Sequence, residues 1–216
     1  MDALVRSYAA VDDGDLMLCR QHGVAYQRDM AAGRVAYGAD YWGRCLDYEG
    51  TAIERALNAG RVALVDEYAG PGALVCDVGV GAGTFIRARR GPTWGTDVNP
   101  VALAWLRERG LWATELRAFD ALTFWDVLEH VEDPGIYLDQ ARPGALVFAS
   151  LPVFADLSEI RASRHYRPGE HLYYWTEPGF VAWMAARRFR LLDRRDFETA
   201  AGRDNILSFA FRKEPA

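Results

Sequence analysis

The stretch VCDVGVGAGTF, residues 75–85, decides the fold of this 216-residue chain. The apolar run at 73–76 predicts a short buried strand, since it is bounded by a Pro-Gly turn and by a cluster of glycines. The glycines occupy every second position, at Gly79, Gly81 and Gly83. Because glycine has no Cβ, it tolerates positive φ and leaves room for a ligand against the backbone. The stretch therefore predicts a strand, a ligand-binding turn and the start of a helix.

A second stretch, WGTDVN at residues 94–99, indicates the class of ligand. Asp97 lies twenty positions after Asp77, where an acid at the end of the next strand can accept hydrogen bonds from ribose hydroxyls. A dinucleotide-binding turn has its third glycine three positions after the second, and here Thr84 stands at that position. The only lysine is Lys213, so the turn has no Walker lysine either. The spacing favours a nucleoside over a diphosphate.

Composition favours one globular domain with a sizeable core and an N-terminal addition, because half of the residues are apolar. We expect residues 1–50 to form a cap or lid segment of short helices or loops, and residues 51–216 to form the main domain. The net charge is −5 and no basic run occurs, which disfavours a long nucleic acid as partner without excluding a nucleotide.

Three scattered cysteines are too few for a disulfide framework and suit a reducing cytoplasm. The N-terminus lacks the apolar core of a signal peptide, and no apolar run is long enough to span a membrane. We therefore expect a soluble cytoplasmic protein with no membrane partner.

Strands and helices alternate along the predicted main domain. Helices are expected at 51–69, where Thr51 and Glu54 form a capping box, at 84–90, after Asn99 and at 176–186. Strands are expected at 73–76, 93–96, 118–125, 145–151, 189–197 and 206–212, with a reduced one at 112–117. This order predicts an α/β fold with a doubly wound, mostly parallel sheet and an antiparallel C-terminal strand.

The turn DVGVGAG resembles motif I of the class I S-adenosylmethionine-dependent methyltransferases, and WGTDVN resembles their motif II. The resemblance implies a Rossmann-like, seven-stranded fold, S-adenosylmethionine as cofactor, and methyl transfer as the activity. It also implies three groups of cofactor contacts: the methionine portion at Asp77, Gly79, Gly81 and Gly83, the ribose at Asp97 and Asn99, and the adenine or sulfonium side at Phe124 and Trp125.

The segment FDALTFWDVLEHVEDP, residues 119–134, resembles the fourth strand and following turn of the ubiquinone-pathway O-methyltransferases. On a helical turn Asp126, Glu129 and His130 would share one face, because residues three and four apart are neighbours. Two carboxylates and an imidazole on one face can hold a divalent cation. Alternatively, the acids follow the dipole of a helix N-terminus and the histidine packs beneath them.

The segment GEHLYYWTEPGF, residues 169–180, resembles the part of small-RNA 2′-O-methyltransferases that supplies a fourth metal ligand. The resemblance implies Mg²⁺ or Mn²⁺ held by Asp126, Glu129, His130 and His171. Without a metal, the candidate catalytic residues are His171, His130 and His165, since imidazole titrates near neutral pH. His165 could instead anchor its loop through a backbone hydrogen bond.

Together these motifs predict methyl transfer to a hydroxyl oxygen of a small molecule or a nucleotide-like diol, with a metal activating the hydroxyl. Aromatic residues before the main domain, Tyr37, Tyr41 and Trp42, are candidates for closing the pocket or for the core. Two other functions remain open. One is a metal-independent enzyme that methylates nitrogen, a nucleotide or a nucleic acid; the other is a non-catalytic S-adenosylmethionine-binding partner protein.

Overall fold

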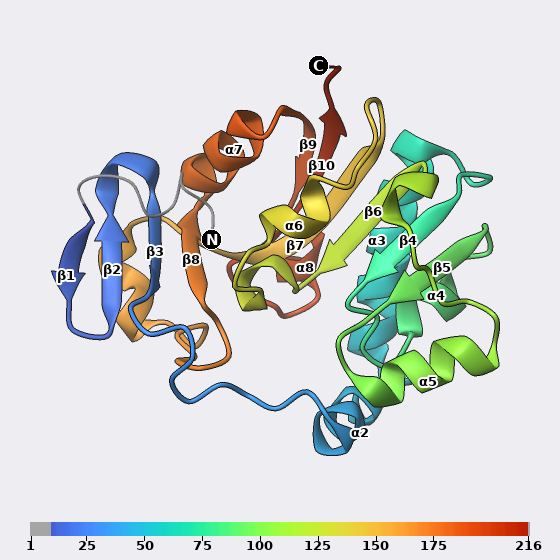
Figure 1. Cartoon of the computed structure of the whole chain (residues 1–216), viewed down its shortest axis with the longest axis horizontal. Coiled ribbons are helices and arrows are strands. Elements are labelled where there is room, and N and C mark those ends of the chain that lie inside the picture. Colours follow the sequence, from blue (N-terminus) through green and yellow to red (C-terminus); the bar gives the residue numbers. More distant parts are fainter. Residues whose placement is uncertain (1–9, 216) are drawn as a thin grey trace.

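The computed structural model describes residues 10–215 and shows one sheet with helices on both of its faces (Figure 1). The strands of this part of the chain are β1 (Val11–Asp13), β2 (Leu16–Cys19), β3 (Val24–Gln27), β4 (Val75–Val78), β5 (Thr93–Thr96), β6 (Ala121–Trp125), β7 (Leu146–Phe154), β8 (Tyr173–Thr176), β9 (Phe189–Arg195) and β10 (Ile206–Lys213). The α-helices are α2 (Ala39–Asp47), α3 (Ala52–Ala69), α4 (Thr84–Ala88), α5 (Pro100–Glu108), α6 (Gly135–Leu138), α7 (Glu177–Ala186) and α8 (Phe197–Ala200). Short 3₁₀ turns are η1 (Arg20–His22), η2 (Leu116–Ala118), η3 (Leu128–His130) and η4 (Leu157–Ala162).

The central strands β5, β4, β6 and β7 are parallel neighbours, and β10 pairs antiparallel with both β7 and β9. This arrangement confirms the predicted α/β class with a mostly parallel sheet and an antiparallel C-terminal strand. The reduced strand expected at 112–117 is a single bridge between Gly95 and Trp112. Within residues 10–215 the sheet has ten paired strands and not the seven that we predicted.

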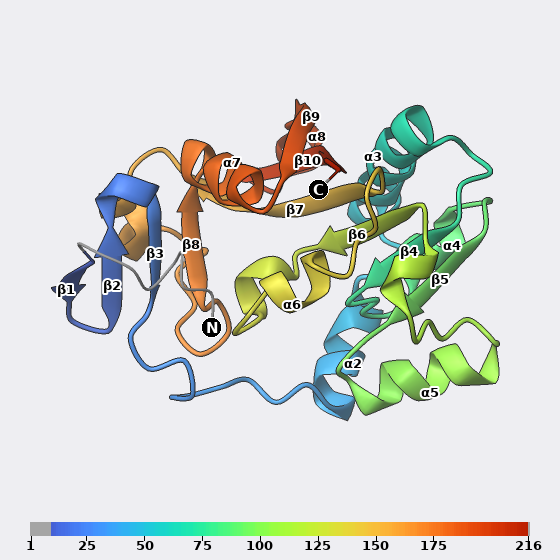
Figure 2. The same cartoon turned by 45° about the horizontal axis from the view of Figure 1, so that its top comes forward.

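The additional strands come from the N-terminal segment, which is not the set of short helices and loops that we expected. The second half of β7 pairs with β8, and the antiparallel strands β3, β2 and β1 continue the sheet from there (Figures 1 and 2). Strands β2 and β3 are buried almost throughout, so their sequences lack the apolar–polar alternation that identifies a half-exposed strand. The predicted cap segment also includes residues 1–9, which lie outside the described residues.

The predicted helix starts are confirmed by their caps. The Thr51 side chain accepts a hydrogen bond from the Glu54 backbone N–H at the start of α3, at 3.1 Å. The Asn99 side chain does the same for Val101 at the start of α5, and Thr176 caps α7. These caps fix where the helices begin and so shape the connections that follow the parallel strands.

A long connection, residues 28–38, leads from β3 to α2, which lies beside α5 near the ends of β4 and β5 (Figures 1 and 2). The ring centroids of Trp42 and Trp105, in these two helices, are 6.4 Å apart. The cap segment thereby contacts two separate parts of the domain: β3 pairs with β8, and α2 packs on α5. No helix within residues 10–215 is long and apolar enough to cross a membrane, and the cytoplasmic location stays a prediction.

Candidate active site

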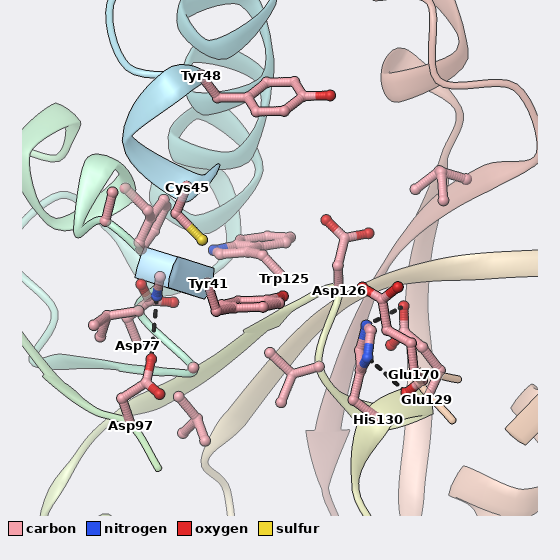
Figure 3. Close-up of a pocket in the computed structure, with 18 of the residues that line it drawn as sticks. Tyr41, Cys45, Tyr48, Asp77, Asp97, Trp125, Asp126, Glu129, His130 and Glu170 are labelled. Carbon is pink, nitrogen blue, oxygen red and sulfur yellow. Dashed lines mark hydrogen bonds and ion pairs between the residues drawn. The ribbon is translucent and has the colours of Figure 1, made fainter. Parts of the chain in front are cut away.

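A cavity of about 1000 Å³ opens at the carboxyl ends of β4, β5 and β6. Ligands bind in this position in doubly wound sheets, because the connections that leave the parallel strands diverge there. Figure 3 shows Asp77 and Asp97 at one end of the cavity and Glu129 and His130 at the other, with Asp126 between them. The cavity therefore joins the two constellations that the sequence placed about fifty residues apart.

Asp77 lies in β4 and is buried at the floor of the cavity. Its carboxylate accepts a hydrogen bond from the Thr123 hydroxyl in the neighbouring strand, at 2.6 Å. Burial raises the pKa of Asp77 to about 7, against the opposing effects of Thr123 and Arg61. A cationic group of a ligand would favour the ionised carboxylate at this position.

Asp97 follows β5, and its two carboxylate oxygens are tied to the backbone on either side. One oxygen accepts from the Gly81 N–H at 3.2 Å and the other from the Asn99 N–H at 2.8 Å. Burial raises the pKa of Asp97, while these N–H donors oppose the shift. Each oxygen retains a second lone pair for a ligand, which is the arrangement that a pair of ribose hydroxyls requires.

The glycines of the turn allow this close approach. Gly79 has φ 79°, and a Cβ atom there would lie 2.6 Å from the Val127 side chain. Gly81 has φ 50°, and its N–H points to Asp97. Both line the cavity, whereas the space that a Cβ at Gly83 would take is filled by the Trp105 ring, at 2.5 Å.

Helix α2 covers the cofactor end of the cavity. Tyr41 and Cys45 line the cavity from this helix, and Trp125 lines it from the end of β6 (Figure 3). Trp125 also packs against Phe85, with ring centroids 5.5 Å apart. Tyr41 therefore closes the pocket as one of our alternatives expected, whereas Trp42 packs on α5.

Two predicted cofactor contacts are corrected by the structure. Phe124 is fully buried and does not line the cavity, because successive residues of a strand point to opposite faces and Trp125 has the cavity side. The Asn99 side chain caps α5 and donates to the Gly38 carbonyl at 3.0 Å, so its polar atoms are already engaged. Asn99 holds α2 in place beside the pocket, and its backbone N–H orients Asp97.

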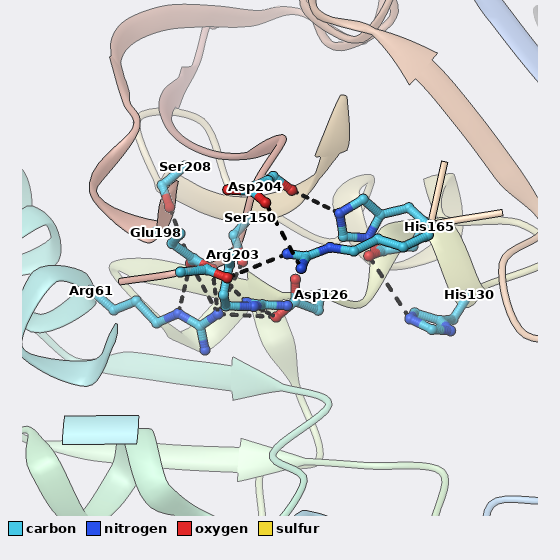
Figure 4. Close-up of polar contacts among 12 residues, drawn as sticks. Arg61, Asp126, His130, Ser150, His165, Glu198, Arg203, Asp204 and Ser208 are labelled. Atoms are coloured by element: carbon cyan, nitrogen blue, oxygen red, sulfur yellow. Dashed lines mark hydrogen bonds and ion pairs between the residues drawn. The ribbon is translucent and has the colours of Figure 1, made fainter. Parts of the chain in front are cut away.

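A network of buried charges forms the wall between the two ends of the cavity (Figure 4). The Asp126 carboxylate accepts hydrogen bonds from Arg61 at 3.0 Å and from Arg203 at 2.8 Å. Both guanidinium groups also bind Glu198, which is fully buried and accepts a hydrogen bond from the Ser208 hydroxyl. The network ties α3, the end of β6, α8 and β10 together.

The predicted four-residue metal set is corrected at Asp126. Burial opposes ionisation there, but the charges of Arg203 and Arg61 hold the pKa of Asp126 well below its usual value. Asp126 has φ 58°, in the left-handed region, and η3 begins only at Leu128, so Asp126 does not share a helical face with the next two predicted ligands. Two arginines take the place of a cation at this carboxylate.

The other three predicted ligands converge. Within residues 10–215, Glu129, His130 and His171 form the one group of potential ligands whose donor atoms all lie within 4.8 Å of one another. The Leu172 N–H donates to the Glu129 carbonyl at 2.7 Å, which brings His171 beside η3. The rings of His130 and His171 meet edge to face, with centroids 4.7 Å apart.

The polar atoms of this triad lack the partners that buried groups normally have. Both carboxylate oxygens of Glu129 are buried without a hydrogen bond, and so is Nδ1 of His171. Burial, with the nearby charge of Asp126, raises the pKa of Glu129, and burial lowers the pKa of His171 to about 2.

Hydrogen bonding defines the orientation of His130. Its Nδ1 lies 2.9 Å from the carbonyl oxygen of Glu170, which can only accept, so Nδ1 carries the proton. Nε2 then presents its lone pair 3.8 Å from a Glu129 oxygen. Metal-binding histidines are usually oriented by a hydrogen bond of this kind from the second ring nitrogen.

His165 lines the same cavity but is tied to its surroundings differently. Its Nε2 donates to the Asp204 carbonyl at 2.8 Å, as Figure 4 shows, and this is the loop-anchoring alternative that the sequence left open. Burial lowers the pKa of His165, so the ring is neutral at physiological pH. Its role as a catalytic base stays a prediction.

Sequence reasoning missed Arg61 and Glu198. Arg61 lies in α3 and lines the cavity, and Glu198 lies in α8, 137 residues further along the chain, and holds the Arg61 guanidinium. A single arginine or glutamate in a helix is usually exposed, so neither residue gives a local signal.

Comparisons with known proteins agree with this geometry. A family model described as a methyltransferase domain matches residues 51–194. The chain belongs to this methyltransferase family. The enzyme class is that of S-adenosylmethionine-dependent methyltransferases, and the division into a cap of residues 1–50 and a main domain of residues 51–216 stays a prediction. The narrower resemblance to ubiquinone-pathway and small-RNA enzymes stays a prediction.

Solved methyltransferases share the fold at low sequence identity. The 1,6-didemethyltoxoflavin-N1-methyltransferase of Burkholderia thailandensis is 18% identical, with 89% of this chain and 96% of that chain covered and a TM-score of 0.55. The magnesium protoporphyrin IX methyltransferase of Synechocystis is 17% identical, covering 81% and 94%, with a TM-score of 0.56. The N-methyltransferase NodS of Bradyrhizobium japonicum is 17% identical, covering 77% and 99%, with a TM-score of 0.55. No curated protein sequence matches the chain.

Proposed function

We propose that this methyltransferase transfers the methyl group of S-adenosylmethionine to a hydroxyl oxygen of a small, polar acceptor, with a divalent cation bound beside the acceptor. At the cofactor end, Asp97 and the Gly81 backbone would hold the ribose, and Asp77 would face the methionine ammonium group. Tyr41 and Trp125 would enclose the adenine or the sulfonium. S-Adenosylmethionine supplies a methyl group on a good leaving group, so these residues have to orient it and exclude water.

The single observation that carries the proposed acceptor chemistry is the buried, unpaired carboxylate of Glu129. A buried carboxylate without hydrogen bonds is costly and needs either a proton or a cation. One nitrogen each of the His130 and His171 rings lies within 4.8 Å of a carboxylate oxygen of Glu129. The donor set of one carboxylate and two imidazoles would suit a first-row divalent ion such as Mn²⁺ better than Mg²⁺, which prefers oxygen ligands, and it leaves positions for oxygen atoms of a substrate.

A divalent cation lowers the pKa of a hydroxyl that it binds, and thereby favours the alkoxide that accepts a methyl group. In this chain His130 is oriented by the Glu170 carbonyl, and His171 is oriented by the backbone around Leu172. The pair would therefore present lone pairs in a fixed direction toward the acceptor end. A vicinal diol could occupy two adjacent positions, which supports a catechol-like or ribose-like acceptor.

Metal-binding and turnover experiments test this proposal together. We expect the wild-type protein to bind Mn²⁺ in isothermal titration, and the Glu129→Gln variant to bind it at least tenfold more weakly, because the charged ligand is lost. Glu108→Gln is the matched control, since Glu108 is an exposed glutamate of α5 that does not line the cavity. Methylation of a panel of diols should depend on Mn²⁺ or Mg²⁺. Equal Mn²⁺ binding by wild type and Glu129→Gln would refute the site.

A metal-independent N-methyltransferase is the second candidate, because Nδ1 of His171 is buried without a hydrogen-bond partner and could orient an amine by accepting a hydrogen bond from its N–H group. In that case the buried Glu129 carboxyl would carry a proton. Turnover of amines that persists after removal of divalent ions with a chelator would support this candidate over the first.

A further inference from the structure

We infer that the methyl acceptor carries an anionic group, a phosphate or a carboxylate, which binds to arginines at the acceptor end of the cavity. This inference rests on the proposed function only in placing the acceptor beside the triad of Glu129, His130 and His171. It identifies the substrate class, which that triad alone leaves undefined.

The first support is where the arginines lie. Arg34, Arg164 and Arg167 all line the cavity. Arg34 comes from the connection between β3 and α2, and the other two flank His165 in the loop before β8. The two segments touch, since the Val35 N–H donates to the Gly169 carbonyl at 3.2 Å. Three arginines from two packed segments therefore line the acceptor end of the cavity.

The second support is how loosely these arginines are paired. The nearest carboxylate oxygens lie 3.9 Å from Arg34 and Arg164 and 3.5 Å from Arg167. One terminal nitrogen of Arg34 is buried without any hydrogen bond. By contrast, Arg61 is held by Asp126 and Glu198 at 2.9–3.0 Å. The arginines at the acceptor end therefore have N–H groups that can still bind an anion, whereas those of Arg61 are engaged by two carboxylates.

Guanidinium groups bind phosphate and carboxylate in the same bidentate manner, so the two sources need separate probes. The phosphate probe is ribose 5-phosphate, compared with ribose. The carboxylate probe is glucuronate, compared with glucose. Isothermal titration would measure the binding of each sugar to the protein saturated with S-adenosylhomocysteine, and a second series would add Mn²⁺. Binding is measured without turnover, so it does not depend on whether methyl transfer to these sugars occurs.

We expect at least one charged sugar to bind about tenfold more tightly than its neutral counterpart, because two charge-assisted contacts are gained. The double variant Arg164→Ala/Arg167→Ala should lose this preference. The matched control is Arg190→Ala, in an arginine of similar exposure that lies on β9 and outside the cavity. The preference should remain in the control and weaken with added salt.

Equal affinity for charged and neutral sugars would overturn the inference, as would a preference that persists in the double variant or disappears in the control. Absence of measurable binding of either charged sugar at millimolar concentration would overturn it as well. A preference that follows the arginines, combined with absence of metal-dependent methylation of any diol, would instead refute the proposed function and leave the anion site in place.

Discussion

Asp97 offers the sharpest test of how the chain would hold its cofactor. Its carboxylate is fixed by the N–H groups of Gly81 and Asn99, so it cannot turn away from the pocket. In an Asp97→Asn variant one oxygen becomes an NH₂ group, which repels the N–H donor it faces and can no longer accept from a ribose hydroxyl. The other oxygen remains an acceptor but loses its charge.

The expected loss in affinity follows from these two changes. A hydrogen bond to a charged group contributes about 1.5–3 kcal/mol, and a neutral one about 0.5–1.5 kcal/mol. Losing one charged bond and weakening the second therefore costs about 2–4 kcal/mol. Because each 1.4 kcal/mol is a factor of ten, the Kd for S-adenosylhomocysteine should rise by about 30-fold to 1000-fold.

Isothermal titration with S-adenosylhomocysteine measures this change directly. The matched control is Asp120→Asn, because Asp120 also accepts a backbone N–H, from Leu74 at 2.9 Å, but stands at the opposite end of the parallel strands and outside the cavity. The control should keep the wild-type Kd. If Asp97→Asn unfolds cooperatively like the wild type and its Kd stays within threefold, the assignment of Asp97 to the ribose is refuted.

Three further outcomes are expected. Glu198→Gln should lower the free energy of unfolding, measured with urea, by about 3–5 kcal/mol, because Arg61 and Arg203 would then share a single carboxylate; a change below 1 kcal/mol would contradict a structural role for the network. The pKa of Asp77 is raised to about 7 in the folded state, so the folded protein binds more protons there than the unfolded chain, and this contribution to stability is lost as the pH rises from about 4 to 7. In Asp77→Asn the free energy of unfolding, measured with urea between pH 5 and pH 8, should therefore decline less steeply with pH than in the wild type. Identical slopes of this free energy against pH would show that Asp77 is ionised throughout. Removing divalent ions with a chelator should lower the melting temperature of the wild type and leave that of Glu129→Gln unchanged, whereas equal shifts would place the bound metal elsewhere.

Much of the fold followed from local chemistry. The glycine turn, the acid after β5 and the caps at Thr51 and Asn99 each depend on a few adjacent residues, and these were confirmed where predicted. The N-terminal strands were missed because β2 and β3 are buried on both faces by contacts with distant strands, so no alternating pattern marks them.

The candidate site divides in the same way. Asp97 and Gly81 are 16 residues apart and meet because they follow β5 and β4, which are parallel neighbours. Proximity in the sequence was enough to connect Glu129 with His130, which are adjacent in η3. It misled us at Asp126, where one left-handed residue turns the carboxylate from the predicted ligand face to two arginines.

The sequence by itself determined the fold class, the cofactor turn and the types of residue available for chemistry, because strand, glycine and capping signals act over a few neighbouring positions. Only the tertiary structure decided which charges are neutralised and which remain available. Arg61 and Arg203 meet Asp126 across more than sixty residues of chain, whereas the Glu129 carboxylate is left buried without a hydrogen bond. That difference depends on which strands lie side by side, and the ordering of strands is a property of the packed sheet and not of any local segment.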